Sequence, residues 1–221
     1  MKKGIEGVIF DFNGVLWWDN ELQKQAWGNF CVKFRGNSLT SEEYAHNIQG
    51  TPNKAGIEYI LGHEILQTEA DALTEEKESG YRELCLQQGT NFKLSPGAIN
   101  FLDHLMTKNI PRTIATSSEV VNVKFFFQYL NLSTWFDFDT AVFDTGSYPG
   151  KPAPFIYLKA AEKLGLPPKD CMVIEDAKSG IAAAHAAGIG WIVALGSKEQ
   201  HKKLSQLPGV NQTIEQLDEL L

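Results

Sequence analysis

Residues 7–15 read GVIFDFNGV, an apolar run that ends in a carboxylate, an amide and a glycine. The run Gly7–Phe10 predicts a buried strand, because parallel strands covered on both faces are continuously apolar. Asp11 then stands at the carboxyl end of that strand, and Gly14 allows the backbone to turn sharply after it. This position suits a nucleophile or a metal ligand, although Asp-x-Asn-Gly taken alone also fits a simple turn. The other predicted strand ends decide between the two.

Further apolar runs alternate with amphipathic segments along the chain. We predict four more strands at 112–115, 140–143, 172–174 and 191–194, and helices at 96–108, 120–129, 154–164 and 178–187. Strands that alternate with helices form parallel sheets, so the fold class expected is α/β, with a doubly wound parallel-sheet (Rossmann-like) core. Residues 214–221 are expected to form a final packed helix. Ligands of such sheets bind at the carboxyl ends of the strands.

A helical insertion interrupts this pattern after the first strand. Residues 17–88 contain no convincing strand, and helices are predicted over 21–35, 41–48, 53–61 and 68–86. We therefore expect two domains: residues 1–16 and 89–221 as the α/β core, and residues 17–88 as an inserted helical cap. A cap of this kind would open and close over the strand ends, admitting substrate and excluding water.

Polar side chains follow the other predicted strands. TSS at 116–118 follows the second strand, Lys151 follows the third, and Glu175 with Asp176 follows the fourth. A carboxylate can attack phosphorus when a cation offsets the repulsion between them, while hydroxyl, amide and ammonium groups hold the transferring oxygens. Carboxylate and carbonyl oxygens favour Mg2+, and no His/Cys set for zinc is present. The pattern therefore indicates Mg2+-dependent phosphoryl transfer.

Four motifs together resemble the haloacid dehalogenase (HAD) superfamily over most of the chain. They are DFNGV at 11–15, ATSS at 115–118, GKPAP at 150–154 and IEDAKSG at 174–180. The resemblance is greatest to the helical-cap branch near β-phosphoglucomutase and the phosphosugar phosphatases, in which the cap follows the first strand as it does here. This resemblance implies an enzyme, a HAD-like phosphatase or phosphotransferase.

The resemblance also implies a role for each motif residue, in three overlapping groups. The catalytic residues would be Asp11, Asn13, Thr116 and Lys151, with Asp11 as the residue phosphorylated and Lys151 stabilising the transition state. The residues that bind the substrate's phosphate would be Gly14, Thr116, Ser117 and Lys151. The residues around Mg2+ would be Asp11, Asn13 through its backbone carbonyl, Glu175 and Asp176.

Asn13 departs from the family pattern, which places an aspartate two residues after the nucleophile. That aspartate protonates the leaving oxygen and later deprotonates water, and such acid–base catalysis contributes about 10²–10⁴-fold. An amide can donate a hydrogen bond but cannot exchange a proton near neutral pH. We expect slow turnover of ordinary phosphomonoesters and less effect on acyl or aryl phosphates. Asp19 and Glu21, near the start of the cap, are candidates for a substitute proton donor.

Three explanations for Asn13 stay open: a natural phosphatase with another proton donor, a binding or regulatory protein, and an engineered Asp-to-Asn variant. The first expectation is a Mg2+-dependent phosphohydrolase acting on a small phosphorylated metabolite, above all a sugar phosphate, through a phospho-Asp11 intermediate that Asn13 weakens or alters. The alternatives are a phosphosugar-binding or regulatory protein without turnover and a β-phosphoglucomutase-type mutase.

The composition argues against several other classes of protein. The 221 residues are 43% hydrophobic and 21% charged, as in ordinary globular domains. A net charge of -7 without a basic cluster argues against a nucleic-acid partner, and the apolar run near the N-terminus is too short for a membrane span. Three scattered cysteines fit a reducing compartment, so a cytoplasmic location is expected. The aromatic run at 125–127 leaves a monomer or a weak homodimer open.

Overall fold

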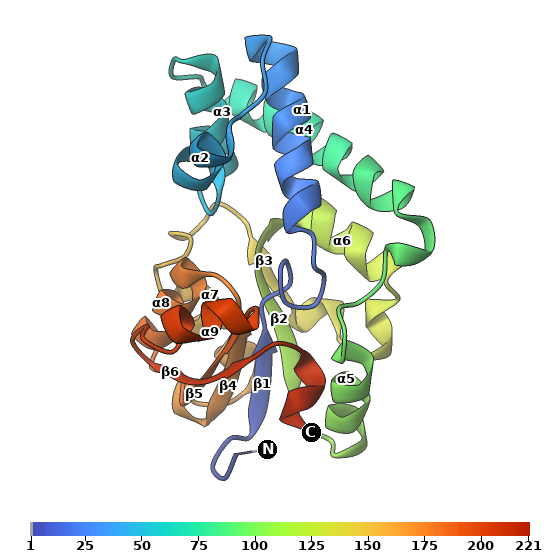
Figure 1. Cartoon of the computed structure of the whole chain (residues 1–221). Coiled ribbons are helices and arrows are strands. Elements are labelled where there is room, and N and C mark those ends of the chain that lie inside the picture. Colours follow the sequence, from blue (N-terminus) through green and yellow to red (C-terminus); the bar gives the residue numbers. More distant parts are fainter. Residues whose placement is uncertain (1) are drawn as a thin grey trace. The chain divides into compact units, whose positions relative to one another are not determined.

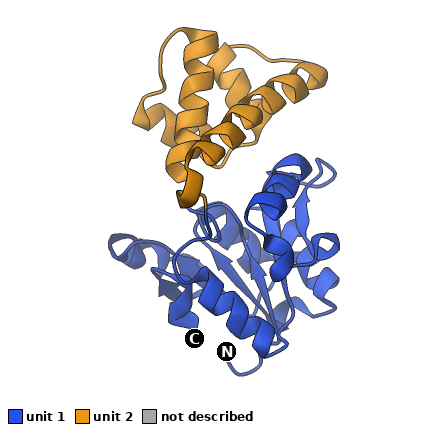
Figure 2. Ribbon diagram, turned by 90° about the vertical axis from the view of Figure 1, so that its right-hand side faces the viewer, with its two compact units in different colours: residues 1–18, 93–221 blue, residues 19–92 orange. Residues whose placement is uncertain are grey.

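The chain forms two compact units, which Figure 2 colours separately. The structure, a computed structural model, describes residues 2–221. Met1–Trp18 and Lys93–Leu221 make up the first unit, called the core unit below, and Asp19–Phe92 make up the second, called the helical unit. Each unit encloses its own cluster of buried apolar side chains.

A six-stranded sheet forms the centre of the core unit (Figure 1). Its strands are β1 (Gly7–Phe10), β2 (Arg112–Glu119), β3 (Val142–Asp144), β4 (Cys171–Glu175), β5 (Trp191–Leu195) and β6 (Val210–Ile214). All neighbouring pairs are parallel, in the order β3-β2-β1-β4-β5-β6. The chain winds outward in opposite directions from β1 and β4, so a crevice is expected at their carboxyl ends. The α/β, doubly wound fold class is confirmed.

Helices cover both faces of this sheet, which explains why β1 is apolar throughout. They are α5 (Ala98–Thr107), α6 (Val120–Tyr129), α7 (Phe155–Leu164), α8 (Lys178–Ala186) and α9 (Lys198–Leu204). Side chains alternate between the faces of a strand. Ile9 accordingly joins the buried cluster that contains Tyr157 of α7 and Ile181 of α8. Phe10 faces the other way and packs edge-on against Phe101 of α5, with ring centroids 6.0 Å apart.

The helical unit contains helices only, as the sequence pattern predicts. They are α1 (Asn20–Arg35), α2 (Ser41–Glu43), a π-helical turn (Tyr44–Ile48), α3 (Asn53–Leu61), α4 (Gln67–Gln87) and a 3-10 turn (Gly89–Asn91). Thr40 and Glu43 cap α2 reciprocally, each backbone N–H donating to the other's side chain at 2.8 and 3.1 Å. Such a box satisfies two N–H groups that a helix start leaves without partners. Within residues 2–221, no helix combines the length and the apolarity that a bilayer-spanning segment needs.

Two sequence-based expectations about the core unit are wrong. Residues 214–221 do not form a helix: Ile214 ends strand β6, and only a short 3-10 turn follows at Leu217–Leu220. β6 lies at the edge of the sheet and contains polar residues, so no apolar run in the sequence indicates this strand. One of them, Asn211, accepts a hydrogen bond from the Ile192 N–H at 2.7 Å through its side chain. β2 also continues beyond residue 115, to Glu119, after an irregularity in its pairing with β3. The TSS motif therefore lies within a strand.

Candidate active site

The turn after β1 places Asp11 and Gly14 next to β4. Asp11 N–H donates to the Ile174 carbonyl at 3.0 Å, which extends the pairing of β1 with β4 by one residue. Gly14 N–H then donates to the Trp17 carbonyl at 2.7 Å, closing a tight turn. Gly14 has a φ of +81°, and a Cβ atom at this position would overlap the carboxylate of Asp176. Glycine is therefore required both by the backbone conformation and by the close approach of an acidic group.

Lys151 lies between two buried carboxylates at the carboxyl ends of β1 and β4. Its Nζ donates to Asp11 Oδ1 and to Glu175 Oε1, both at 2.6 Å. Glu175 is fully buried, and two more donors hold it: Tyr157 Oη at 2.9 Å from Oε1 and Ala177 N at 2.8 Å from Oε2. Both oxygens of the glutamate thus have protein partners, and Glu175 fixes where the ammonium group of Lys151 lies.

Burial and mutual charge shift the pKa values of this group. Burial is the largest effect on Asp11 and raises its pKa to about 7, with Lys151 lowering it and Glu175 raising it. Burial by itself would lower the pKa of Lys151, but Asp11 and Glu175 outweigh it and hold that pKa well above its ordinary value. The raised pKa of Asp11 therefore reflects mainly its removal from water, and the negative charge of Glu175 adds to it.

Three carboxylates gather here in a way that suits a cation. One carboxylate oxygen each from Asp11, Glu175 and Asp176 lies within 4.8 Å of the others. With Lys151 as the cation bonded to two of them, the four side chains carry a formal charge of about -2 when all are ionised. Hard oxygen ligands and a double negative charge fit a divalent cation such as Mg2+, whereas soft metals prefer sulfur and imidazole.

Hydroxyl groups of β2 bind the side chain of Asn13. Asn13 Oδ1 accepts from Ser118 Oγ at 2.8 Å and, more weakly, from Thr116 Oγ1 at 3.5 Å. Thr116 is buried, and its hydroxyl also accepts from the Ser118 backbone N–H at 3.1 Å. Ser117, by contrast, is exposed on the strand. The structure therefore groups Asp11, Lys151, Glu175 and Asp176, and links Asn13 directly to β2.

The pattern of the sequence does not mark two residues that touch this site. Tyr157 donates to Glu175 from α7, six residues after Lys151, and looks in the sequence like one more core aromatic residue. Ser118 stands in the TSS motif, but nothing in that motif indicates its bond to Asn13. Asp19, a candidate proton donor, is buried inside the helical unit, where it accepts from Tyr81 Oη at 2.6 Å and Gln23 Nε2 at 3.2 Å. Glu21 is exposed.

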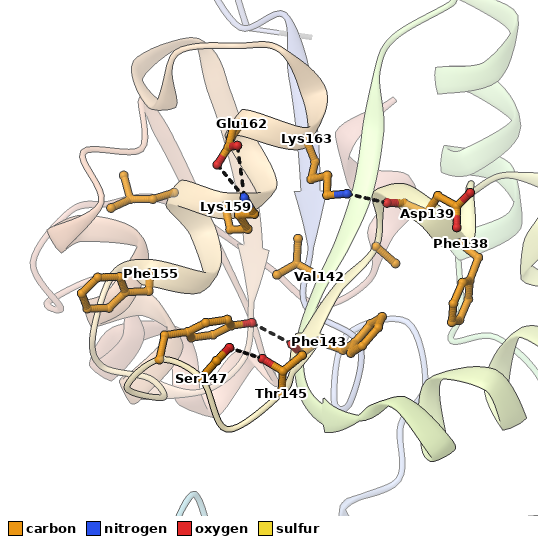
Figure 3. A pocket seen from close by; sticks show the side chains of 13 residues that line it. Phe138, Asp139, Val142, Phe143, Thr145, Ser147, Phe155, Lys159, Glu162 and Lys163 are labelled. Atoms are coloured by element: carbon orange, nitrogen blue, oxygen red, sulfur yellow. Dashed lines mark hydrogen bonds and ion pairs between the residues drawn. The ribbon is translucent and has the colours of Figure 1, made fainter.

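A hollow of about 640 Å³ lies elsewhere in the core unit, beside β3 and α7 (Figure 3). Its wall is mainly aromatic and aliphatic. Its charged lysines bond to neighbouring groups: Lys159 pairs with Glu162, and Lys163 donates to the Asp139 backbone carbonyl at 2.9 Å. None of the residues predicted for the active site lines it. The hollow is therefore separate from the buried charged residues at the carboxyl ends of β1 and β4.

Comparisons with known proteins show the family to which the chain belongs. The family model of the haloacid dehalogenase-like hydrolases matches residues 5–188. A phosphorylated carbohydrates phosphatase of Thermotoga maritima is 31% identical over 189 residues, 84% of this chain and 82% of the relative. The β-phosphoglucomutase of Bacillus subtilis is also 31% identical, over 84% of this chain and 81% of its own.

A solved structure extends the likeness to nearly the whole chain. The crystal structure of a HAD hydrolase of family IA, variant 3, from Entamoeba histolytica superposes with a TM-score of 0.92 at 40% identity, covering 98% of this chain and 96% of that one. The match of the family model spans both the carboxylate turn after β1 and the acidic pair at the end of β4. The chain therefore belongs to the haloacid dehalogenase-like hydrolases, a family of enzymes.

Proposed function

We propose that this protein is a Mg2+-dependent phosphohydrolase that acts on a small phosphorylated metabolite through a phosphorylated Asp11. The observation that carries the proposal is the buried arrangement in which Lys151 Nζ bonds both Asp11 and Glu175 at 2.6 Å, beside Asp176. A buried carboxylate held in place by a lysine and close to further acidic ligands is suited to attack an electrophile that arrives with a cation.

Each residue of the group has a task in this reaction. Asp11 attacks the phosphorus atom, and Lys151 offsets the negative charge that builds on the transferring oxygens. Asp11, Asp176 and the Asn13 backbone carbonyl would hold Mg2+, which when bound neutralises the phosphate and lets a carboxylate approach it. Glu175, with both oxygens engaged by protein donors, orients Lys151 and adds negative charge to the metal group. Thr116, Ser117 and Gly14 would contact the phosphate oxygens.

The relatives support a phosphorylated carbohydrate as the substrate class. One relative is named a phosphatase of phosphorylated carbohydrates and the other a mutase of a phosphosugar. A mutase is the weaker candidate, because returning the phosphoryl group to a sugar hydroxyl calls for the acid–base group that Asn13 lacks. We propose further that the helical unit, Asp19–Phe92, acts as the cap that shields the reaction from bulk water.

Phosphate release tests the proposal. The protein is incubated with Mg2+ and a panel of sugar phosphates, acetyl phosphate and an aryl phosphate, in parallel with Asp11→Ala and Asn13→Asp. We expect release by the native chain that requires Mg2+ and is lost in Asp11→Ala, and faster release from sugar phosphates in Asn13→Asp. Release that persists in Asp11→Ala would contradict the proposed nucleophile, and activity confined to Asn13→Asp would favour a binding or regulatory role.

A further inference from the structure

Asn13 stands where a phosphoryl-transfer site of this kind calls for a proton donor, two residues after Asp11. Its Oδ1 accepts from Ser118 Oγ at 2.8 Å and from Thr116 Oγ1 at 3.5 Å, so β2 holds the side chain by its oxygen end. A planar amide held in this way carries its NH2 group at the other end. An NH2 group can donate a hydrogen bond to an oxygen, but it cannot transfer a proton near neutral pH.

The other groups in contact with the carboxylate cluster are already engaged. Glu175 accepts three hydrogen bonds, from Lys151, Tyr157 and the Ala177 backbone. Lys151 bridges two carboxylates, and Asp176 belongs to the candidate metal group. Within the described core unit, therefore, the groups bonded to this cluster either stabilise negative charge or attract a cation, and none is placed as a proton donor to a leaving oxygen.

From this arrangement we infer a narrower class of good substrates within the proposed function: among phosphorylated metabolites, carbohydrates included, the protein cleaves fast only those phosphate esters and anhydrides whose leaving oxygen departs as a stable anion, such as acyl, enol or aryl phosphates. Ester phosphates of ordinary alcohols are poor substrates, because an alkoxide must be protonated as it leaves. The inference rests on the proposed function. It makes Asn13 a specificity-determining residue rather than a mark of a lost activity.

The reaction balances without an acid in its first half. A carboxylate oxygen of Asp11 forms a bond to phosphorus, the bond from phosphorus to the leaving oxygen breaks, and that oxygen departs with the electron pair as an anion. In the second half a water oxygen attacks phosphorus, the bond to Asp11 breaks, and the water's proton passes to solvent. The Asp11 carboxylate is itself an acidic leaving group, but no base activates the water, so this second half limits turnover.

The test is a leaving-group series on the native chain and on Asn13→Asp. With Mg2+ present, kcat/KM is measured for aryl phosphates from dinitrophenyl phosphate to phenyl phosphate, whose phenol has a pKa of about 10, like that of tyrosine. We expect kcat/KM of the native chain to fall by about 100-fold or more along the series and that of Asn13→Asp to fall far less, since a positioned acid is worth about 10²–10⁴-fold. Acetyl phosphate should react with the native chain as readily as the most acidic aryl phosphate.

The native chain should also release one equivalent of leaving group rapidly, followed by a slow steady rate that is the same for all good donors. Equal leaving-group dependence in the native chain and Asn13→Asp would overturn the inference while leaving the phosphohydrolase intact. The inference would also be overturned if kcat/KM of the native chain changed little along the leaving-group series but fell steeply in Asp19→Asn. That result would assign the proton donor to the helical unit. Full activity in Asp11→Ala would instead overturn the proposed function itself.

Discussion

Replacement of Gly180 by alanine is predicted to destabilise the protein, although helix propensity alone predicts the opposite. Gly180 lies in the first turn of α8, and an alanine in a helix is favoured over glycine by at most about 1 kcal/mol. A Cβ atom on Gly180, however, would occupy the position of the Glu175 carboxyl group. The side chain of Glu175 is fully buried, so it has no adjacent solvent into which it could move.

The magnitude follows from what the displaced carboxylate would lose. Glu175 is bonded to Lys151, Tyr157 and the Ala177 backbone, and a hydrogen bond to a charged group contributes about 1.5–3 kcal/mol. Overpacking of a filled interior adds about 1–3 kcal/mol. Loss of a single one of these bonds already outweighs the gain in helix propensity, so we expect Gly180→Ala to lower the free energy of unfolding by about 2–5 kcal/mol.

Urea unfolding followed by circular dichroism and tryptophan fluorescence measures this effect. Gly28→Ala in α1 and Gly80→Ala in α4 are matched controls, because a Cβ atom at either position meets nothing within 4 Å. Both should be neutral or stabilising by up to about 1 kcal/mol in the unfolding of the helical unit. If Gly180→Ala proved as stable as the native chain, or more stable, the close approach of α8 to Glu175 would be refuted.

Three further predictions concern single side chains. Gly14→Ala should push the carboxylate of Asp176 away and weaken Mg2+ binding by about tenfold or more, measured by calorimetric titration; unchanged affinity would exclude Asp176 from the metal group. Tyr157→Phe removes one donor to the buried glutamate and should cost about 1–2 kcal/mol in urea unfolding together with a lower kcat; an unchanged kcat and stability would contradict a positioning role. In the helical unit, the hydrogen bond from the Thr40 backbone N–H is the largest of the effects that lower the pKa of Glu43 from 4.5 to about 2. The native chain should therefore be more stable than Glu43→Gln in urea unfolding above pH 4.5, and this difference should disappear as the pH falls towards about 2. A difference independent of pH would be inconsistent with the lowered pKa.

The fold was largely predictable where apolar patterns are strong. Gly7–Phe10, Val120–Tyr129 and Asn53–Leu61 occupy the predicted positions, since a buried strand leaves a continuous apolar run and amphipathic helices leave a three- and four-residue periodicity in the sequence. β6 escaped prediction because an edge strand with polar residues carries no such pattern. The extension of β2 to Glu119 depends on pairing with β3, a contact between distant parts of the chain that no local pattern contains.

The site was predictable in its motifs and not in its connections. Parallel topology brings Asp11, Lys151 and Asp176 to one edge of the sheet, so their proximity follows from the order of the strands. The link from Tyr157 to the buried glutamate, and that from Ser118 to the side chain of Asn13, depend on side-chain packing between separate elements. Such contacts become visible only in three dimensions.

The most direct test of the account is to look for the phosphoryl group on Asp11. The native chain, Asn13→Asp and Asp11→Ala are mixed with acetyl phosphate and Mg2+, quenched in acid, digested and examined by mass spectrometry. We predict a phosphoryl group on the peptide that contains Asp11, longer-lived in the native chain than in Asn13→Asp and missing in Asp11→Ala. A native chain that never carries phosphate on that peptide, or that carries it equally in Asp11→Ala, would contradict the central claim.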